Sequence, residues 1–151
     1  MNEFKDITLV CDDSFDGIMT AIYDGWVLML KGNKVKIYPG DDYAYELFCE
    51  NINCKTNVKK AISVAQAIQQ KISVEAYEYV FRAAHHYDKN RGNAILEFLK
   101  VGFRAGSRTT KMLSENRVMT VMELARKASN EANVFREILR FKEITVNFYL
   151  A

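Results

Sequence analysis

The sequence predicts a single α+β domain, predominantly helical with a small sheet. The longest unbroken helical pattern, Val118–Phe141, has apolar residues at three- and four-residue steps, which make one stripe that other segments must cover. Two short segments differ, because Ile7–Cys11 is rich in β-branched residues and Val35–Tyr38 alternates between apolar and polar, as strands do. At 151 residues and 49% hydrophobic content, the chain can bury one core but is short for two domains.

The first third of the chain is predicted to place a helix between strands. Ile7–Cys11 is expected to be a buried strand that ends at an acidic turn. Asp13 or Ser14 can cap the helix that follows, Phe15–Leu30, since both side chains accept hydrogen bonds from a helix start. Tyr45–Cys54 is ambiguous, and a strand is favoured in its second half.

One strip of the predicted Phe15–Leu30 helix carries small residues. Gly17, Ala21 and Gly25 stand four positions apart and therefore share one side of the helix. Because glycine costs helix stability, two glycines on this strip predict the close approach of another helix or of the sheet.

Three shorter helices are predicted between residues 56 and 103. Thr56 is expected to cap the first, which extends through Lys71, and Ser73 is expected to cap the second. The third covers Gly92–Phe103. The positions expected to face the core are Val58, Ala61, Ile62, Ala65 and Ile68 in the first helix, Val74, Tyr77, Phe81 and Ala84 in the second, and Ile95, Leu99 and Phe103 in the third.

The last residues, Lys142–Leu150, alternate between apolar and polar in the manner of a strand that stops without a turn or a polar tail. Residues 1–151 are therefore expected to be the N-terminal portion of a longer protein, with apolar surface left around Val146, Phe148 and Leu150. Such an edge predicts self-association through pairing of the C-terminal strand.

The charges are distributed unevenly along the chain. Residues 1–50 contain ten acidic and four basic residues, a net charge of −6, whereas residues 51–151 contain seventeen basic and nine acidic residues, a net charge of +8. The basic part suits a polyanionic partner, although attraction between the two parts on folding accounts for the same imbalance. The candidate phosphate contacts are Arg104, Arg108, Lys111, Arg126, Arg136 and Arg140.

The sequence predicts no metal site and no cofactor. The three cysteines are an odd number without CxxC spacing, and the only two histidines are adjacent, which on a helix is poor geometry for a shared metal. A candidate polar cleft consists of Asp12, Asp13, Glu131 and Asn133. An enzyme that uses the three acids of this cleft is an alternative, although no base, nucleophile or metal set accompanies them.

Several stretches of the chain resemble a bacterial family labelled "probable DNA metabolism protein". They are VCDDSFDGIMTAIYDGW, TNVKKAISVAQAIQQKIS, ILEFLKVGFRAG and NEANVFREILRFKEI, and together they span nearly the whole range of residues 7–143. Members of that family accompany a radical-SAM protein assigned to DNA repair and are sometimes fused to uracil-DNA-glycosylase-like domains, so the resemblance implies a setting in DNA repair. Asn133, Val134 and Glu137 depart from the family pattern, which commonly has His, then Arg or Lys, then Gly at these positions.

These observations predict an accessory nucleic-acid-binding protein of bacterial DNA repair or modification that contacts the phosphate backbone of DNA without sequence preference. The alternative is a protein–protein docking module for the radical-SAM or glycosylase-like partner, with no DNA contact of its own. Salt separates the two, because phosphate binding weakens steeply with ionic strength and apolar docking does not. The sequence shows no spanning segment and no secretory signal, so we expect a cytoplasmic protein without a membrane partner.

Overall fold

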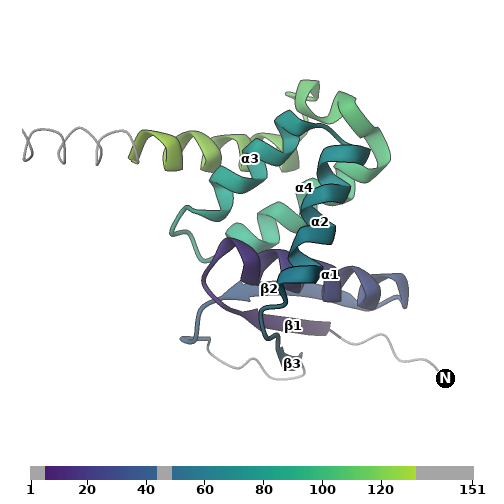
Figure 1. The fold of residues 1–151 in the computed structure, drawn as a ribbon, viewed down its shortest axis with the longest axis vertical. Helices are drawn as coiled ribbons and strands as arrows, with labels where there is room; N and C mark the ends of the chain where they lie inside the picture. The colour runs from purple at the N-terminus through teal and green to yellow at the C-terminus, as the bar shows by residue number, and fades with distance from the viewer. Residues whose placement is uncertain (1–5, 44–48, 132–151) are drawn as a thin grey trace, which may run out of the picture.

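The structure, a computed structural model, describes residues 6–43 and 49–131, with a small sheet along one side and helices stacked on it (Figure 1). The predicted class, a predominantly helical α+β domain, is confirmed. The elements are β1 (Asp6–Cys11), α1 (Phe15–Leu30), β2 (Lys34–Pro39), β3 (Cys49–Asn53), α2 (Val58–Lys71), α3 (Val74–Ala84), α4 (Arg91–Ala105) and the 3-10 helix η1 (Gly106–Lys111), followed by a helix over 116–131.

The described strands form a parallel sheet in the order β2-β1-β3, with β1 in the centre. Parallel neighbours need a crossover, and α1 supplies it between β1 and β2. Ile7, Leu9 and Cys11 of β1 are all buried, as expected for the central strand of a sheet that helices cover. Strands were predicted for all three segments, and the structure confirms them.

Helix α1 begins and ends as predicted, at Phe15 and Leu30. Of the two candidate caps, Ser14 is the one used, because its side chain accepts a hydrogen bond of 3.0 Å from the backbone N–H of Gly17. This bond satisfies one of the donors that a helix start leaves without a partner.

The predicted close approach along α1 is confirmed at one glycine and takes another form at the other. A Cβ on Gly25 would lie 3.0 Å from Cγ1 of Val35 and 3.2 Å from Cδ1 of Leu9, so this part of the helix touches the sheet directly. A Cβ on Gly17 would instead meet the carbonyl oxygen of Asp12, in the loop just before the helix. Gly17 therefore permits a tight entry into α1, and the prediction that it touches another element is wrong.

We expect Gly25→Leu to lower the free energy of unfolding by about 1–3 kcal/mol, because the added side chain has to displace Val35 and Leu9. Chemical denaturation measures the loss. Val27→Leu, at a half-exposed position of the same helix, is the matched control and should leave the stability nearly unchanged. Equal stability of the two variants would mean that α1 does not pack this closely on the sheet.

Helices α2 and α3 form as predicted, but two details of the prediction are wrong. Asn57 caps α2 by accepting a bond of 3.2 Å from the N–H of Lys60, while Thr56 bonds to Asp12 instead. Ser73 caps α3 as predicted, accepting 3.0 Å from the N–H of Ala76. Some positions predicted to face the core are exposed, namely Val58, Ile62, Val74 and Phe81.

The buried stripes of these two helices are narrower than their apolar patterns. In α2 the buried residues are Ala61, Val64 and Ile68, and in α3 they include Ala76 and Val80. A wide apolar stripe can turn either of its edges inward, and contact with neighbouring helices decides which edge is covered. The other edge then faces solvent.

Helix α4 extends one residue before and two residues beyond the predicted range, and it lies against β2. A Cβ on Gly92 would lie 2.8 Å from Cγ2 of Ile37, and the side chain of Asn93 accepts a bond of 2.7 Å from the N–H of Ile37. Ile95 and Leu99 are buried as predicted. The helix ends at Ala105 and is capped by Gly106, whose φ of +66° favours glycine.

The long C-terminal helix is described over 116–131, where Val118, Val121 and Ala125 are buried and confirm that part of the apolar stripe. The remainder of the predicted helix and the predicted strand from Lys142 lie outside the described residues, so self-association through that strand stays a prediction. None of the helices within the described ranges is both long and apolar enough to cross a bilayer.

Candidate functional site

Acidic residues gather at the carboxyl edge of the sheet, where ligands commonly bind in open parallel sheets. Asp12 and Asp13 follow β1, and Asp42 follows β2. Each of the three has a partner: Thr56 donates to Asp12, Arg91 and Lys89 pair with Asp13, and Tyr38 donates to Asp42.

Arg91 is buried at this edge of the sheet, and its side chain is only 3% exposed. Its Nε donates to the carbonyl of Ala84 at 2.9 Å, its Nη1 to the carbonyl of Asp88 at 3.1 Å, and its Nη2 to Asp13. One guanidinium thus ties the start of α1 to the loop between α3 and α4. Arg91 was not among the predicted site residues. The only feature of the sequence that pointed to it was its position, as a cation beside Gly92 at the start of an apolar helix.

Lys89 forms an ion pair with Asp42, and the Tyr38 hydroxyl donates a hydrogen bond to it. Lys89 Nζ lies 3.4 Å from Asp42 and 3.3 Å from the carbonyl of Pro39. The hydrogen bond from the Tyr38 hydroxyl, with the nearby Lys89, lowers the pKa of the Asp42 carboxyl. Asp12, Asp13 and Asp42 therefore each have a partner within the protein, as expected of acids with a structural role.

Two members of the predicted polar cleft, Asp13 and Glu131, each contact a residue within or directly after the α3–α4 loop. Asp13 contacts Arg91 at one end of the α3–α4 loop, and Glu131 lies 3.8 Å from Nε2 of the buried His86 within that loop. Asp12 bonds to Thr56, and Asn133 lies outside the described residues. Within residues 6–43 and 49–131, no group of three His, Cys, Asp or Glu side chains could hold a metal ion.

Burial raises the pKa of two thiols. It raises the pKa of Cys11 to about 12, with the nearby Cys54 adding to the effect, and it raises the pKa of Cys54 to about 11. Because the thiolate is the reactive form, both residues are poor nucleophiles near neutral pH. All three cysteines are reduced in the structure.

We expect iodoacetamide at pH 8 to label Cys11 and Cys54 far more slowly in the folded protein than in denaturant, because folding keeps both thiols protonated. The folded pKa values exceed the unfolded reference of 9.0, so the stabilisation is complete below pH 9 and is lost as the pH rises towards 12. Peptide mass spectrometry gives the rates, and the denatured chain is the control. Fast labelling of Cys11 in the folded protein would contradict its burial.

Several predicted phosphate contacts lie together after α4. Arg104 occupies the last turn of α4, while Arg108 and Lys111 occupy η1, and all three are exposed. A Cβ on Gly106 would lie 3.7 Å from the carbonyl of Lys71, so the end of α2 reaches the same place. We call Lys71, Arg104, Arg108 and Lys111 the basic end.

The charges of the basic end are uncompensated as far as the described chain goes. None of its four side chains forms an ion pair with a described residue, whereas Lys60, Lys89, Lys100 and Arg117 all do. Arg126 is also exposed, on the helix over 116–131. Arg136 and Arg140 lie outside the described residues.

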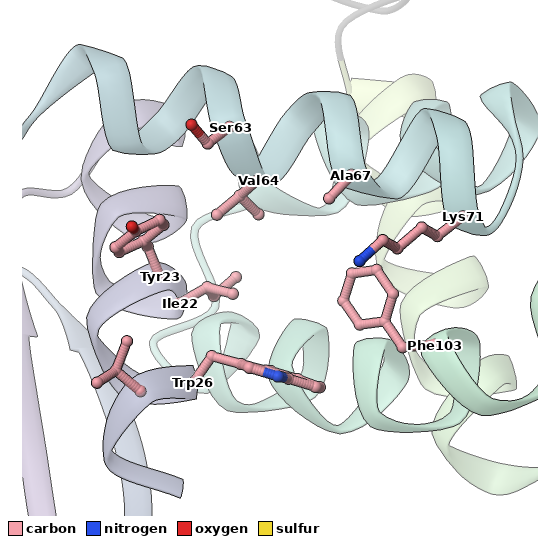
Figure 2. Close-up of a pocket in the computed structure, with 9 residues that line it drawn as sticks. Ile22, Tyr23, Trp26, Ser63, Val64, Ala67, Lys71 and Phe103 are labelled. Atoms are coloured by element: carbon pink, nitrogen blue, oxygen red, sulfur yellow. The ribbon is translucent and has the colours of Figure 1, made fainter. Parts of the chain in front are cut away.

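A pocket of about 430 Å³ opens between α1, α2 and α4, beside the basic end. It is lined by Ile22, Tyr23, Trp26, Val27, Ser63, Val64, Ala67, Lys71 and Phe103. Figure 2 shows the Trp26 ring extending from α1 towards Phe103, with Lys71 beside Phe103 and with Tyr23 and Ser63 towards the other end. The rings of Trp26 and Phe103 meet edge to face, with centroids 5.2 Å apart.

Comparison with known families adds one observation. Residues 89–151 match the family described as "Domain of unknown function", DUF4130. No curated protein and no solved structure matches the chain.

The DUF4130 match begins two residues before α4 and extends past the described residues. Among the described residues it includes Arg104, Arg108, Lys111 and Arg126, whereas the carboxyl-edge acids and Trp26 precede it. The chain is therefore similar to an uncharacterised family over its basic C-terminal part, and the family's description assigns no activity.

Proposed function

We propose that this chain is an accessory nucleic-acid-binding protein that contacts DNA phosphates through its basic end. The observation that carries the proposal is the gathering of Lys71, Arg104, Arg108 and Lys111 at one place without ion pairs to described residues. Phosphate contacts of this kind give affinity and position without sequence preference. The resemblance noted in the sequence supports a role in bacterial DNA repair or modification.

A simpler explanation accounts for only half of the cluster. Cations near a helix C-terminus interact favourably with the helix dipole, by about 0.3–1 kcal/mol each, and this explains Lys71 at the end of α2 and Arg104 at the end of α4. Arg108 and Lys111 lie on η1, a short 3-10 helix beyond α4, where the dipole of α4 falls off. An external anion is the better explanation for these two.

The test is duplex binding measured by fluorescence anisotropy over a range of salt concentrations. We expect a dissociation constant on the order of 10⁻⁴–10⁻⁶ M near physiological salt, with a log–log salt slope of about −0.9 per phosphate neutralised. The triple variant R104A/R108A/K111A should make the slope shallower by up to three phosphates. The matched control, K31A/K55A/K59A, removes three exposed lysines from elsewhere on the chain and should change the slope little.

Two results would overturn the proposal. One is no duplex binding even at low salt, where the attraction is strongest. The other is an equal change of slope in the triple variant and its control, because binding would then follow net charge and not the basic end.

The second candidate is a docking module for a radical-SAM or glycosylase-like partner. It is favoured by apolar side chains that α2 and α3 leave exposed, among them Ile62 at 50% and Phe81 at 42% exposure. Affinity for such a partner should depend little on salt, and Phe81→Ser should weaken it while leaving duplex binding intact.

A further inference from the structure

We infer that the pocket between α1, α2 and α4 holds one unstacked nucleotide, with its base against Trp26 and Phe103 and its phosphate against Lys71. The inference rests on the proposed function and names the form of nucleic acid that fits it, a single strand. The shared chemistry is a flat aromatic ring joined to a phosphate, which a strand or a free mononucleotide can supply.

The size and walls of the pocket suit a flat ring. Small-molecule sites usually enclose about 300–1,000 Å³, and this pocket, at about 430 Å³, is large enough for a nucleotide. Trp26 and Phe103 are both half-buried, so each ring keeps surface that a ligand can contact. Aromatic side chains on which bases stack are the usual device of proteins that bind single strands without sequence preference.

The polar groups of the pocket lie at opposite ends, as a nucleotide requires. Lys71 is exposed and makes no ion pair with a described residue, so its ammonium group can take a phosphate. The hydroxyls of Tyr23 and Ser63 lie towards the other end (Figure 2). Ser63 donates to the carbonyl of Lys59 at 3.0 Å and its oxygen is turned along α2, so the Tyr23 hydroxyl is the group at this end that can bond to the edge of a base.

The pocket is continuous with the basic end, and this continuity favours a nucleic acid strand over a purely apolar occupant. Lys71 belongs to both, and Arg104 directly follows Phe103 on α4. A strand with one base in the pocket could therefore lay its next phosphates on Arg104 and Arg108. An apolar helix of a partner protein would fill the same volume but would leave Lys71 without an anion.

The chain's only tryptophan, Trp26, reports on the pocket directly. We expect a short oligothymidylate to quench its fluorescence. An oligonucleotide of the same length that lacks the bases should bind the basic end without quenching. A matched duplex, whose bases are already stacked, should also bind without quenching. Thymidine monophosphate quenching at comparable concentrations would support the same site and assign it to a free nucleotide.

Two variants test the contacts. Phe103→Leu keeps the pocket apolar but removes a ring, and it should weaken oligothymidylate binding about tenfold while duplex binding is unchanged. Lys71→Gln, at an exposed position that should not disturb folding, should weaken binding of the mononucleotide and the strand alike. Thermal melting of both variants checks that the fold is intact.

The outcomes separate this inference from the proposed function. If the oligothymidylate binds but neither quenches Trp26 nor depends on Phe103, the pocket inference is overturned and the phosphate contacts stand. If neither strand nor duplex binds at low salt, both fail. Quenching by an amphipathic apolar peptide, and not by any nucleotide, would overturn the inference in favour of a partner helix.

Discussion

Arg91→Ala is expected to lower the free energy of unfolding by about 2–5 kcal/mol, as is usual when a large buried side chain is cut back to alanine. The carbonyls of Ala84 and Asp88 lose a charged donor, and the guanidinium leaves a void among buried groups. Asp13 is 53% exposed and can turn to water, so its lost attraction is the smaller part of the effect.

A double-mutant cycle with Asp13→Ala separates the part of this loss that comes from the Asp13–Arg91 pair from the part that comes from Arg91 alone. We expect a modest coupling energy between Asp13 and Arg91 and a large residual cost for Arg91 alone, measured by urea denaturation. The control is Lys127→Ala, which breaks an exposed pair with Glu123 at 3.6 Å and should cost about 0.5 kcal/mol or less. If Arg91→Ala proves as mild as that control, Arg91 does not hold the sheet edge to α4.

Gly17→Ala is expected to destabilise the protein by about 1–3 kcal/mol, even though alanine is the better helix former. The new Cβ would lie 2.4 Å from the carbonyl oxygen of Asp12, which is backbone. The entry from β1 into α1 would have to open, and this threatens the Ser14 cap. Thermal or chemical denaturation measures the loss.

Gly102→Ala is the matched control for this prediction. Its Cβ would also lie 2.4 Å from a neighbour, but that neighbour is Cδ1 of Ile72, the far end of a flexible side chain. Rotation of Ile72 can relieve the contact, and the gain in helix propensity of up to about 1 kcal/mol offsets the remaining strain. If both variants lose the same stability, the rigidity of the β1–α1 entry is not what decides the outcome at Gly17.

Helix ends were predictable because local chemistry sets them. Ser14 and Ser73 each accept a bond from a backbone N–H three residues ahead, and the sequence alone shows that pattern. Which edge of a helix turns inward was harder to predict, as Val58 and Phe81 show. Periodicity places an apolar stripe on a helix, whereas the position of the neighbouring helices decides how much of it is covered.

The candidate sites were predictable only where they are local. Arg104 and Arg108 are exposed, as expected for phosphate contacts. Their exposure could be predicted because both residues lie at or just after the end of a helix. Arg91 meets Asp13 across 78 residues, and the Trp26–Phe103 pair joins α1 to α4. A periodic pattern within one segment gives no information about contacts between distant segments. The Arg91–Asp13 contact and the pocket could therefore not be predicted before the fold was known.

The central place of β1 has a consequence for synthesis. A ribosome makes the middle strand first and completes its two neighbours by Asn53, before α2, α3 or α4 exists. Helix α1 already covers Val35 on the inner face of β2, but Ile37 on the same face stays open to water until Gly92 has emerged to cover it. For that interval the nascent chain presents paired strands whose apolar face α1 covers only in part, the kind of surface that chaperones protect from aggregation.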